Sequence, residues 1–215
     1  MRYLLERGRV WRSSGESERG CPLFLEAFEL AKEGGFHGHA VDAAHMLGIA
    51  LEGDEALTWN LDAIAYAERH PDDEHAQRWL GALYNNTAWT LHEASRLDEA
   101  LDLFERALAL RVRAEVVEPI LIARWSVARC LRSMGDTSRA LALQLALRRA
   151  REALGQPGGY VFEELGELHT LRGELEQAAE AFGRAHELLS MDGWMVKNEA
   201  VRLERVLALS RGEED

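Results

Sequence analysis

The sequence repeats with a period of about 40 residues, and this period limits the possible folds more than any other feature of the chain. Three columns of residues keep the period through the chain. The first column is mostly aromatic or aliphatic, the second is mostly alanine, and the third is uniformly small. The columns are Phe24, Ile64, Phe104, Gln144 and Phe182; Ala27, Ala67, Ala107, Leu147 and Ala185; and Gly8, Gly48, Ala88, Ala128 and Gly166.

Each repeat is predicted to be a hairpin of two helices. The aromatic and alanine columns are three residues apart, so both lie on one face of a helix. An apolar pattern with helical spacing runs up to a break such as Gly15, Gly135 or Gly173 and then resumes. Small residues let two helices approach to about 8 to 10 Å, and a neighbouring bulky ring fills the gap between hairpins. We therefore expect an all-α protein.

Composition and charge exclude several classes of partner. Four prolines in 215 residues, with many alanines, leucines, glutamates and arginines, favour helix. A net charge of -12 without a run of basic residues repels phosphate backbones, so we expect no nucleic-acid partner. No segment resembles a signal peptide or a membrane span, which predicts a cytoplasmic protein without membrane contact. Cys21 and Cys130 are expected to be reduced thiols.

Two segments carry a recognisable motif: LYNNTAWTLHEASRLDEALDLFERALAL at 83–110 and VFEELGELHTLRGELEQAAEAFGRAHELL at 161–189. They resemble the tetratricopeptide repeat (TPR), in which a large residue, Leu and a small residue mark the first helix, and Ala, an aromatic and Ala mark the second. The fourth repeat departs most from the pattern. The matching residues of the fifth repeat are Phe162, Leu165, Gly166, Gly173, Ala178, Phe182 and Ala185, and the departures in the fourth are Arg124, Gln144 and Leu147.

The resemblance implies a right-handed α-α superhelical solenoid of about five TPR-like hairpins in a single domain, 1–215. A pitch near 40 instead of 34 residues is similar to the stretched repeats of kinesin light chains and of bacterial peptide-sensing regulators, and longer helices would deepen the groove. One amphipathic helix, 194–209, with Val196, Ala200, Leu203 and Leu207 as its apolar stripe, would cap the last hairpin. The expected repeats are 1–35, 36–73, 74–115, 116–157 and 158–193, followed by a tail, 210–215.

Signals for catalysis or metal binding are weak. His37, His39, Asp42 and His45 form a local cluster, but it lacks the i, i+4 pairing of a helical metal site, so a solvated helix start is the better interpretation. The segment HPDDEH at 70–75 lies where a turn and a helix N-terminus belong, and acids are favoured there by the helix dipole. No nucleophile motif or phosphate-binding glycine loop is present. We expect no enzyme activity, cofactor or metal.

The first helix of each hairpin should face the concave wall of such a solenoid, so its residues outside the core stripe become candidate ligand contacts. Trp and Arg often anchor interfaces because each buries a large area and also donates hydrogen bonds. An Asn side chain can hold a peptide backbone, since its amide donates and accepts at once. Alternatively, Trp89 and Trp125 belong to the core between hairpins and do not contact a ligand. The candidate partner-binding residues are Asn85, Asn86, Trp89, Trp125, Arg129, Arg132, Glu163 and Glu167.

These observations favour a non-catalytic adaptor or scaffold that binds a protein or an extended peptide in its concave groove, as a monomer or a weak homodimer. A regulatory sensor that changes curvature on binding a peptide or small ligand is the alternative. The assignment to a function class follows from the fold analogy. The sequence does not name the partner.

Overall fold

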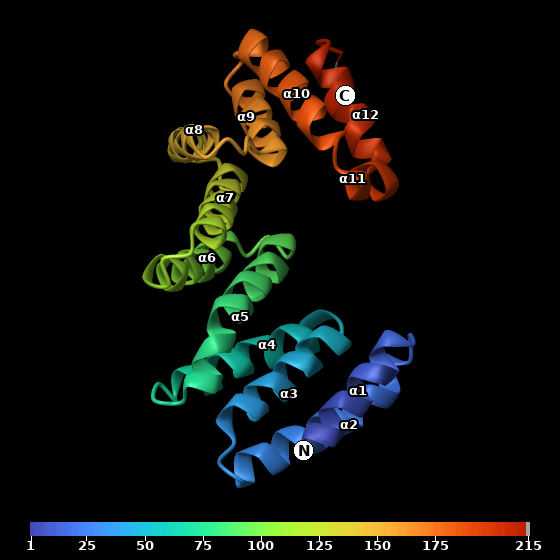
Figure 1. The fold of residues 1–215 in the computed structure, drawn as a ribbon. Coiled ribbons are helices and arrows are strands. Elements are labelled where there is room, and N and C mark those ends of the chain that lie inside the picture. Colours follow the sequence, from blue (N-terminus) through green and yellow to red (C-terminus); the bar gives the residue numbers. More distant parts are fainter. Residues whose placement is uncertain (214–215) are drawn as a thin grey trace. The chain divides into compact units, whose positions relative to one another are not determined.

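The computed structural model describes residues 1–213, and this part of the chain is helical and contains no strand (Figure 1). The chain divides into two compact units, Met1–Ala114 and Glu115–Asp215, where the sequence analysis expects a single domain. The first unit contains α1 (Arg2–Ser13), α2 (Ser17–Glu33), α3 (His37–Ala50), α4 (Gly53–Glu68), α5 (Glu74–Glu93) and α6 (Leu97–Arg113). The second contains α7 (Val117–Ser133), α8 (Thr137–Ala153), α9 (Gly159–Leu171), α10 (Leu175–Leu189), α11 (Gly193–Asn198) and α12 (Ala200–Ser210).

Consecutive helices pair into hairpins, and each of the five expected repeat segments holds one pair, which confirms the all-α fold of helical hairpins. The turns inside the hairpins lie at the predicted breaks. Gly15, Gly135 and Gly173 have φ values of 83°, 83° and 72°, in the left-handed region that glycine adopts at little cost. Ser95 takes the same conformation, with φ 59°, at the equivalent place of the third repeat. The 40-residue period therefore extends to the backbone of the turns.

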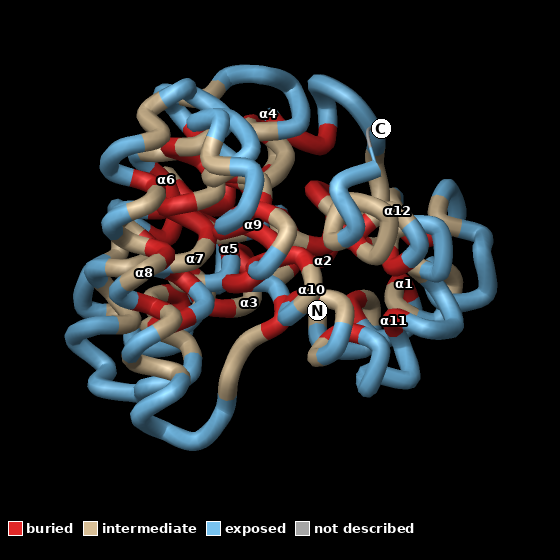
Figure 2. Tube along the Cα trace, turned by 90° about the horizontal axis from the view of Figure 1, so that it is seen from above, coloured by how far each residue is buried: buried red, intermediate tan, exposed pale blue. Residues whose placement is uncertain are grey.

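The small column lets the two helices of a hairpin approach closely. In the fifth repeat, a Cβ added to Gly166 on α9 would lie 2.7 Å from the ring of Phe182 on α10. In the first repeat, Gly8 on α1 faces the ring of Phe24 on α2 in the same way. Figure 2 shows buried residues gathered where helices face one another and exposed residues at the turns. The small column therefore allows close approach as predicted, but the ring packs against the small residue of its own hairpin, where the sequence analysis expected it in the gap between hairpins.

Substituting two glycines by alanine should have effects of opposite sign. Gly166→Ala should lower the free energy of unfolding by about 1 to 3 kcal/mol, because the new methyl group overlaps the Phe182 ring. Gly81→Ala should raise it by about 0.5 to 1 kcal/mol, since Gly81 lies inside α5 with nothing within 4 Å of its added Cβ. Urea unfolding of both variants measures the difference. Equal effects would contradict the close approach of α9 and α10.

The fourth repeat places a polar residue where the other repeats have an apolar one. Gln144 on α8 is completely buried, and its side-chain amide has no hydrogen-bond partner among the described residues. Phe24, Phe104 and Phe182 fill the equivalent place with rings. A buried amide without a partner costs about 1 to 3 kcal/mol. The helices of the fourth repeat form as predicted, but their packing is less favourable than that of its neighbours.

The segment after the fifth hairpin forms two helices, so the expectation of one helix over 194–209 is wrong. The break is at Glu199, next to Asn198, whose Nδ2 donates a 2.8 Å hydrogen bond to the carbonyl oxygen of Trp194. Such local side-chain bonds compete with continuation of a helix. The buried residues are Met195, Leu203 and Val206, so Leu203 alone of the predicted stripe is buried.

The segment still packs on the last hairpin. Leu203 and Val206 belong to one core cluster with Phe182 and Leu189 of α10. Among residues 1–213, no helix has the length and apolar character needed to cross a bilayer.

Candidate functional site

The first helices of successive hairpins lie next to one another in each unit, and we call the surface that they form the first-helix face. It comprises α1, α3 and α5 in the first unit and α7 and α9 in the second. The sequence analysis places all candidate residues on this face.

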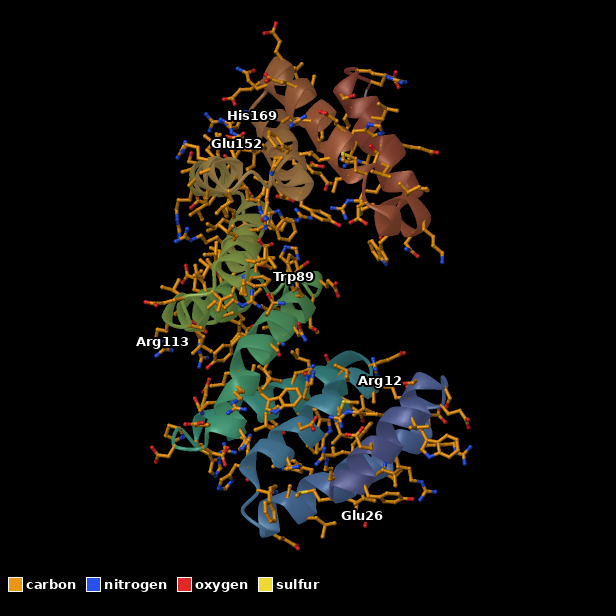
Figure 3. The ribbon with its side chains drawn as sticks, in the orientation of Figure 1. Arg12, Glu26, Trp89, Arg113, Glu152 and His169 are labelled. Atoms are coloured by element: carbon orange, nitrogen blue, oxygen red, sulfur yellow. The ribbon has the colours of Figure 1, made fainter. Side chains whose placement is uncertain are left out.

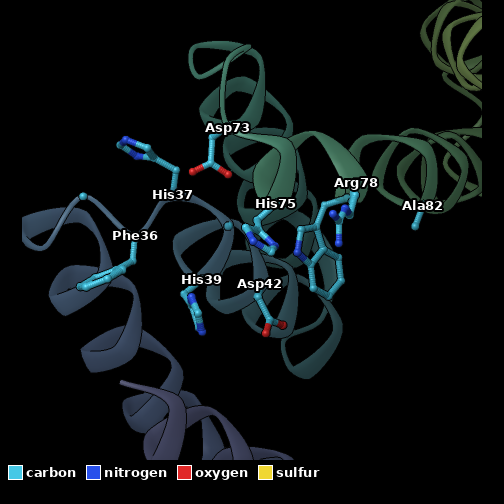
Figure 4. Close-up of a pocket in the computed structure, with 11 residues that line it drawn as sticks. Phe36, His37, His39, Asp42, Asp73, His75, Arg78 and Ala82 are labelled. Atoms are coloured by element: carbon cyan, nitrogen blue, oxygen red, sulfur yellow. The ribbon is translucent and has the colours of Figure 1, made fainter.

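An open pocket of about 750 Å³ lies between α3 and α5 (Figure 4). Every lining residue comes from one of these two helices or from the residues just before them. We call it the α3/α5 pocket. It is lined by Gly35, Phe36, His37, Gly38, His39, Asp42, Asp73, His75, Arg78, Trp79 and Ala82.

The pocket follows from how the two helices begin and meet. Asp73 caps α5, because its Oδ1 accepts a 2.7 Å hydrogen bond from the amide of Ala76. The interpretation of 70–75 as a turn and helix start is thereby confirmed. Gly38 lets α3 approach the start of α5, since an added Cβ would lie 3.1 Å from the carbonyl carbon of His75. Further along, the rings of His45 and Trp79 meet at 5.4 Å between centroids.

The charges around the α3/α5 pocket have partners within the chain. Arg9 on α1 holds both oxygens of Asp42 at 2.5 and 2.7 Å. Arg78 lies 3.6 Å from Glu74. Since Asp42 and Arg78 are paired within the chain, the pocket offers mainly rings and hydrogen-bonding groups to a ligand.

The histidines of this region do not converge on a metal. His37 stacks on His70 at 3.7 Å between centroids, and its Nδ1 lies 3.0 Å from the hydroxyl of Tyr66. In Figure 4, His37 points away from His39, Asp42 and His75, which gather on one side of the pocket. Burial lowers the pKa of His45. In the part of the chain that the structure describes, no group of three or more potential ligands could hold a metal ion.

The candidate residues of the first unit lie on α5, beyond the α3/α5 pocket. Asn86 is exposed and Asn85 is half-buried, and Asn85 Nδ2 donates a 3.3 Å hydrogen bond to Asn86 Oδ1. Trp89, near the end of α5 (Figure 3), is half-buried. Its ring meets the buried ring of Phe104 edge to face at 4.9 Å. Trp89 thus contacts the core on one side and remains accessible on the other. It is therefore partly a core residue, and its accessible side is still able to contact a partner.

Trp125 occupies a second pocket, in the other unit. Its Nε1 donates a 3.2 Å hydrogen bond to the carbonyl oxygen of Tyr160, which orients the half-buried indole. This pocket has a volume of about 420 Å³ and an apolar lining that comes mostly from α7 and the start of α9. The ion pair between Arg151 and Glu118, at 2.7 Å, belongs to it. Each unit therefore has an aromatic pocket between neighbouring first helices.

Arg129 and Arg132 on α7 make ion pairs with Glu164 on α9. Glu164 is buried, and its carboxylate oxygens lie 3.2 Å from Arg129 Nε and 2.8 Å from Arg132 Nε. Burial raises the pKa of Glu164 to about 7 although Arg132 lowers it, and the nearby carboxylates of Glu163 and Glu167 raise it further. These arginines join two first helices of the second unit.

Glu163 and Glu167 on α9 make ion pairs with α12. Arg202 Nε and Nη2 each donate a 2.7 Å hydrogen bond to one oxygen of Glu163, which is only 6% exposed. Arg205 Nη1 donates a 2.8 Å hydrogen bond to Glu167. Paired arginine and carboxylate groups of this geometry are charge-assisted and directional. The C-terminal helix, rather than solvent, lies against these candidate residues.

Asn85, Asn86 and Trp89 belong to one unit, and Trp125, Arg129, Arg132, Glu163 and Glu167 belong to the other. That the candidate residues of both units form one concave wall stays a prediction. Sequence reasoning missed the α3/α5 pocket, because it interpreted 37–45 and 70–75 as two separate helix starts. The repeat period was the signal that could have found it, since His39 and Trp79 are one period apart and so occupy equivalent places on neighbouring helices.

Comparison with solved structures identifies the fold. The chain resembles a protein described as a kinesin light chain of Podosopora anserina, with nearly identical TPR-like repeats, at a TM-score of 0.68 and 15% identity over 86% of this chain and 93% of that one. A variant of that protein gives a TM-score of 0.70 at 15% identity, over 88% and 94% of the two chains. BtubC (BKLC) of P. vanneervenii gives 0.63 at 18% identity, over 91% and 87%. No protein-family model and no curated protein matches the sequence.

The chain thus has the fold of the TPR-like all-α solenoids, as the resemblance implied. This is the kind of fold on which protein-interaction scaffolds are built.

Proposed function

We propose that the chain is a non-catalytic scaffold that binds an extended segment of a partner protein along its first-helix face. The α3/α5 pocket carries this proposal. It is open, it has room for a side chain of a partner, and two consecutive first helices line it with aromatic rings and a few polar groups. Sites of this composition bury apolar area while polar groups fix the orientation of the ligand.

Neighbouring residues support binding of a peptide backbone. Ala82 lines the pocket, and Asn85 and Asn86 follow on α5 about one turn later. Asn86 is exposed, and a side-chain amide can both donate to and accept from a peptide backbone. Trp89 and Trp125 remain in the proposed contact set because both are half-buried on first helices.

The four charged candidates receive a different role in this proposal. Arg129, Arg132, Glu163 and Glu167 all make ion pairs between α7, α9 and α12. A partner would have to break these pairs to use the charges. We therefore propose that they hold neighbouring helices together and that partner contacts rely on rings and amides.

Site-specific crosslinking in the cell that makes the protein tests this function. p-Benzoylphenylalanine at Ala82, which is exposed and lines the α3/α5 pocket, should crosslink to a partner protein. The same group at Glu105, which is exposed on the second helix α6, should not. Equal crosslinking from both positions, or crosslinking from Glu105 alone, would place the binding surface elsewhere.

The identified partner then allows a quantitative test. Trp79→Ala should weaken binding about 30-fold, because truncation of a central aromatic anchor typically costs about 2 kcal/mol. Glu105→Ala should leave the affinity unchanged. Thermal unfolding of both variants distinguishes lost contact from lost structure, since the Trp79 ring also meets His45. Unchanged binding by a folded Trp79→Ala protein would exclude this pocket.

A further inference from the structure

The pocket around Trp125 presents apolar surface to solvent, and we call it the α7/α9 pocket. Ile122 on α7 is 44% exposed and Tyr160 on α9 is 37% exposed, and both line it. The rings of Trp125 and Tyr160 meet edge to face, 6.3 Å apart between centroids, and the buried Val161 also lines the pocket. Apolar surface that remains exposed in a concave site indicates a place of contact with another molecule.

The polar side chains of the α7/α9 pocket are paired within the chain. The indole Nε1 of Trp125 donates to the carbonyl oxygen of Tyr160 at 3.2 Å, and the Tyr160 hydroxyl donates to the sulfur of Met195 at 3.1 Å. Arg151 donates to both carboxylate oxygens of Glu118, at 2.7 and 3.3 Å. A polar group that entered this pocket would lose its water without gaining one of these partners. The pocket therefore favours an apolar occupant.

The ion pair of the pocket is held in place, so its charges do not favour a charged occupant either. The side chain of Arg151 is only 16% exposed, whereas that of Glu118 is 53% exposed. Arg151 lies against the backbone of Gly158, because a Cβ added there would be 2.8 Å from Arg151 Cδ. An acidic group that displaced Glu118, or a basic group that displaced Arg151, would have to break a pair whose arginine is largely buried.

The place of the pocket in the repeat indicates that the occupant is part of a protein chain. Asp42 and Ala82 line the α3/α5 pocket, and Ile122 and Tyr160 line the α7/α9 pocket. Each of the four lies six residues before the small-column residue of its own repeat. Equivalent pockets that recur with the repeat suit an extended chain, which presents one side chain after another. Both pockets are open, whereas sites for free small molecules enclose most of the ligand surface.

We propose that the α7/α9 pocket binds an uncharged hydrophobic side chain of the partner protein. This inference rests on the proposed function and extends it, because it gives the chemistry of a second contact. The α3/α5 pocket combines rings with polar groups such as His39 and His75, so the two pockets select different side chains. Selection in the α7/α9 pocket acts mainly by rejection, since a charged or strongly polar side chain finds no partner there.

Crosslinking from Ile122 tests the chemistry of the occupant. p-Benzoylphenylalanine at this position should crosslink to the same partner as the group at Ala82, and mass spectrometry should locate the crosslink at a hydrophobic residue of the partner. The control is Leu175, which is 69% exposed at the start of the second helix α10 and should give no crosslink. A crosslink to a charged residue would overturn the proposal.

The two crosslinking positions also separate this inference from the proposed function. A crosslink from Ala82 without one from Ile122 would overturn the role of the α7/α9 pocket and leave the α3/α5 pocket as the binding site. A crosslink from Ile122 alone would support the α7/α9 pocket and move the main contact there. Absence of a crosslink from both positions would overturn both proposals.

Affinity for the identified partner gives the quantitative test. Ile122→Asp should weaken binding at least about tenfold, because it places a charge in an apolar contact, whereas Ile122→Leu should stay within about twofold of the unaltered protein. Leu175→Asp, the matched control, should bind normally. Circular dichroism should show all three variants to be folded, since both altered side chains are exposed. Normal binding by a folded Ile122→Asp protein would overturn the proposal.

A change in the partner shows whether the two side chains act together. Replacing the crosslinked partner residue by alanine should weaken binding to the unaltered protein, but should hardly change the already weakened binding to Ile122→Asp. Full losses that simply add would place the partner residue outside the α7/α9 pocket and would overturn the proposal.

Discussion

Phe104→Ala should lower the free energy of unfolding by about 3 to 5 kcal/mol. Phe104 on α6 is only 1% exposed, and its ring meets that of Trp89 on α5 edge to face. Alanine removes the buried ring and leaves a cavity that the two helices of the third hairpin can fill only in part. Urea unfolding followed by circular dichroism measures the loss.

Phe36→Ala is the matched control for this prediction. It deletes the same atoms from the same unit, but Phe36 is 55% exposed and lies before α3. Its effect on unfolding should stay below about 1 kcal/mol, because little burial is lost. If both variants unfold at the same urea concentration as the unaltered protein, Phe104 does not occupy the aromatic column of the repeat.

Arg202→Leu should also destabilise the protein by about 3 to 5 kcal/mol. The substitution leaves the carboxylate of Glu163 buried without the arginine that binds both of its oxygens. A buried charge that loses its partner carries the full cost of its removal from water. The same loss should detach α12 from α9, which hydrogen exchange of residues 200–210 would detect as faster exchange.

Two further variants separate the effect of the unpaired Glu163 charge on stability from the effect of losing the packing of the Arg202 side chain. Combining Arg202→Leu with Glu163→Gln should recover most of the stability, because the uncompensated charge is gone. Arg184→Leu removes an arginine that pairs with Glu187, whose side chain is 62% exposed, and should cost at most about 1 kcal/mol. A double variant as unstable as Arg202→Leu alone would show that packing of the arginine, and not its charge, holds α12.

The fold could be derived from the sequence because it depends on local periodicity. Helical spacing of apolar residues, breaks at Gly15, Gly135 and Gly173, and a small residue opposite a ring all act within one hairpin. These signals recur in successive repeats, so each repeat supports the assignment of the next. The break at Glu199 escaped this reasoning because the apolar spacing of 194–209 continues across it.

The sequence pattern predicted only part of the candidate site. Spacing along one helix placed Asn85, Asn86 and Trp89 on α5 but left open whether Trp89 belongs to the core. It could not show that Arg9 of α1 compensates Asp42. The charge that a ligand meets at the α3/α5 pocket depends on this neighbour, which is 33 residues away.

The sequence by itself thus determined the helices, their pairing into hairpins and the face on which a partner is expected, because these follow from contacts between residues close along the chain. Only the tertiary structure decided which charges on that face are used within the protein. Glu163 and Glu167 have the same spacing as ligand-facing residues, yet α12 packs beside α9 and brings Arg202 and Arg205 to them. Glu163 needs such a partner because the packed helices remove its carboxylate from water, an effect that no pattern along a single helix contains.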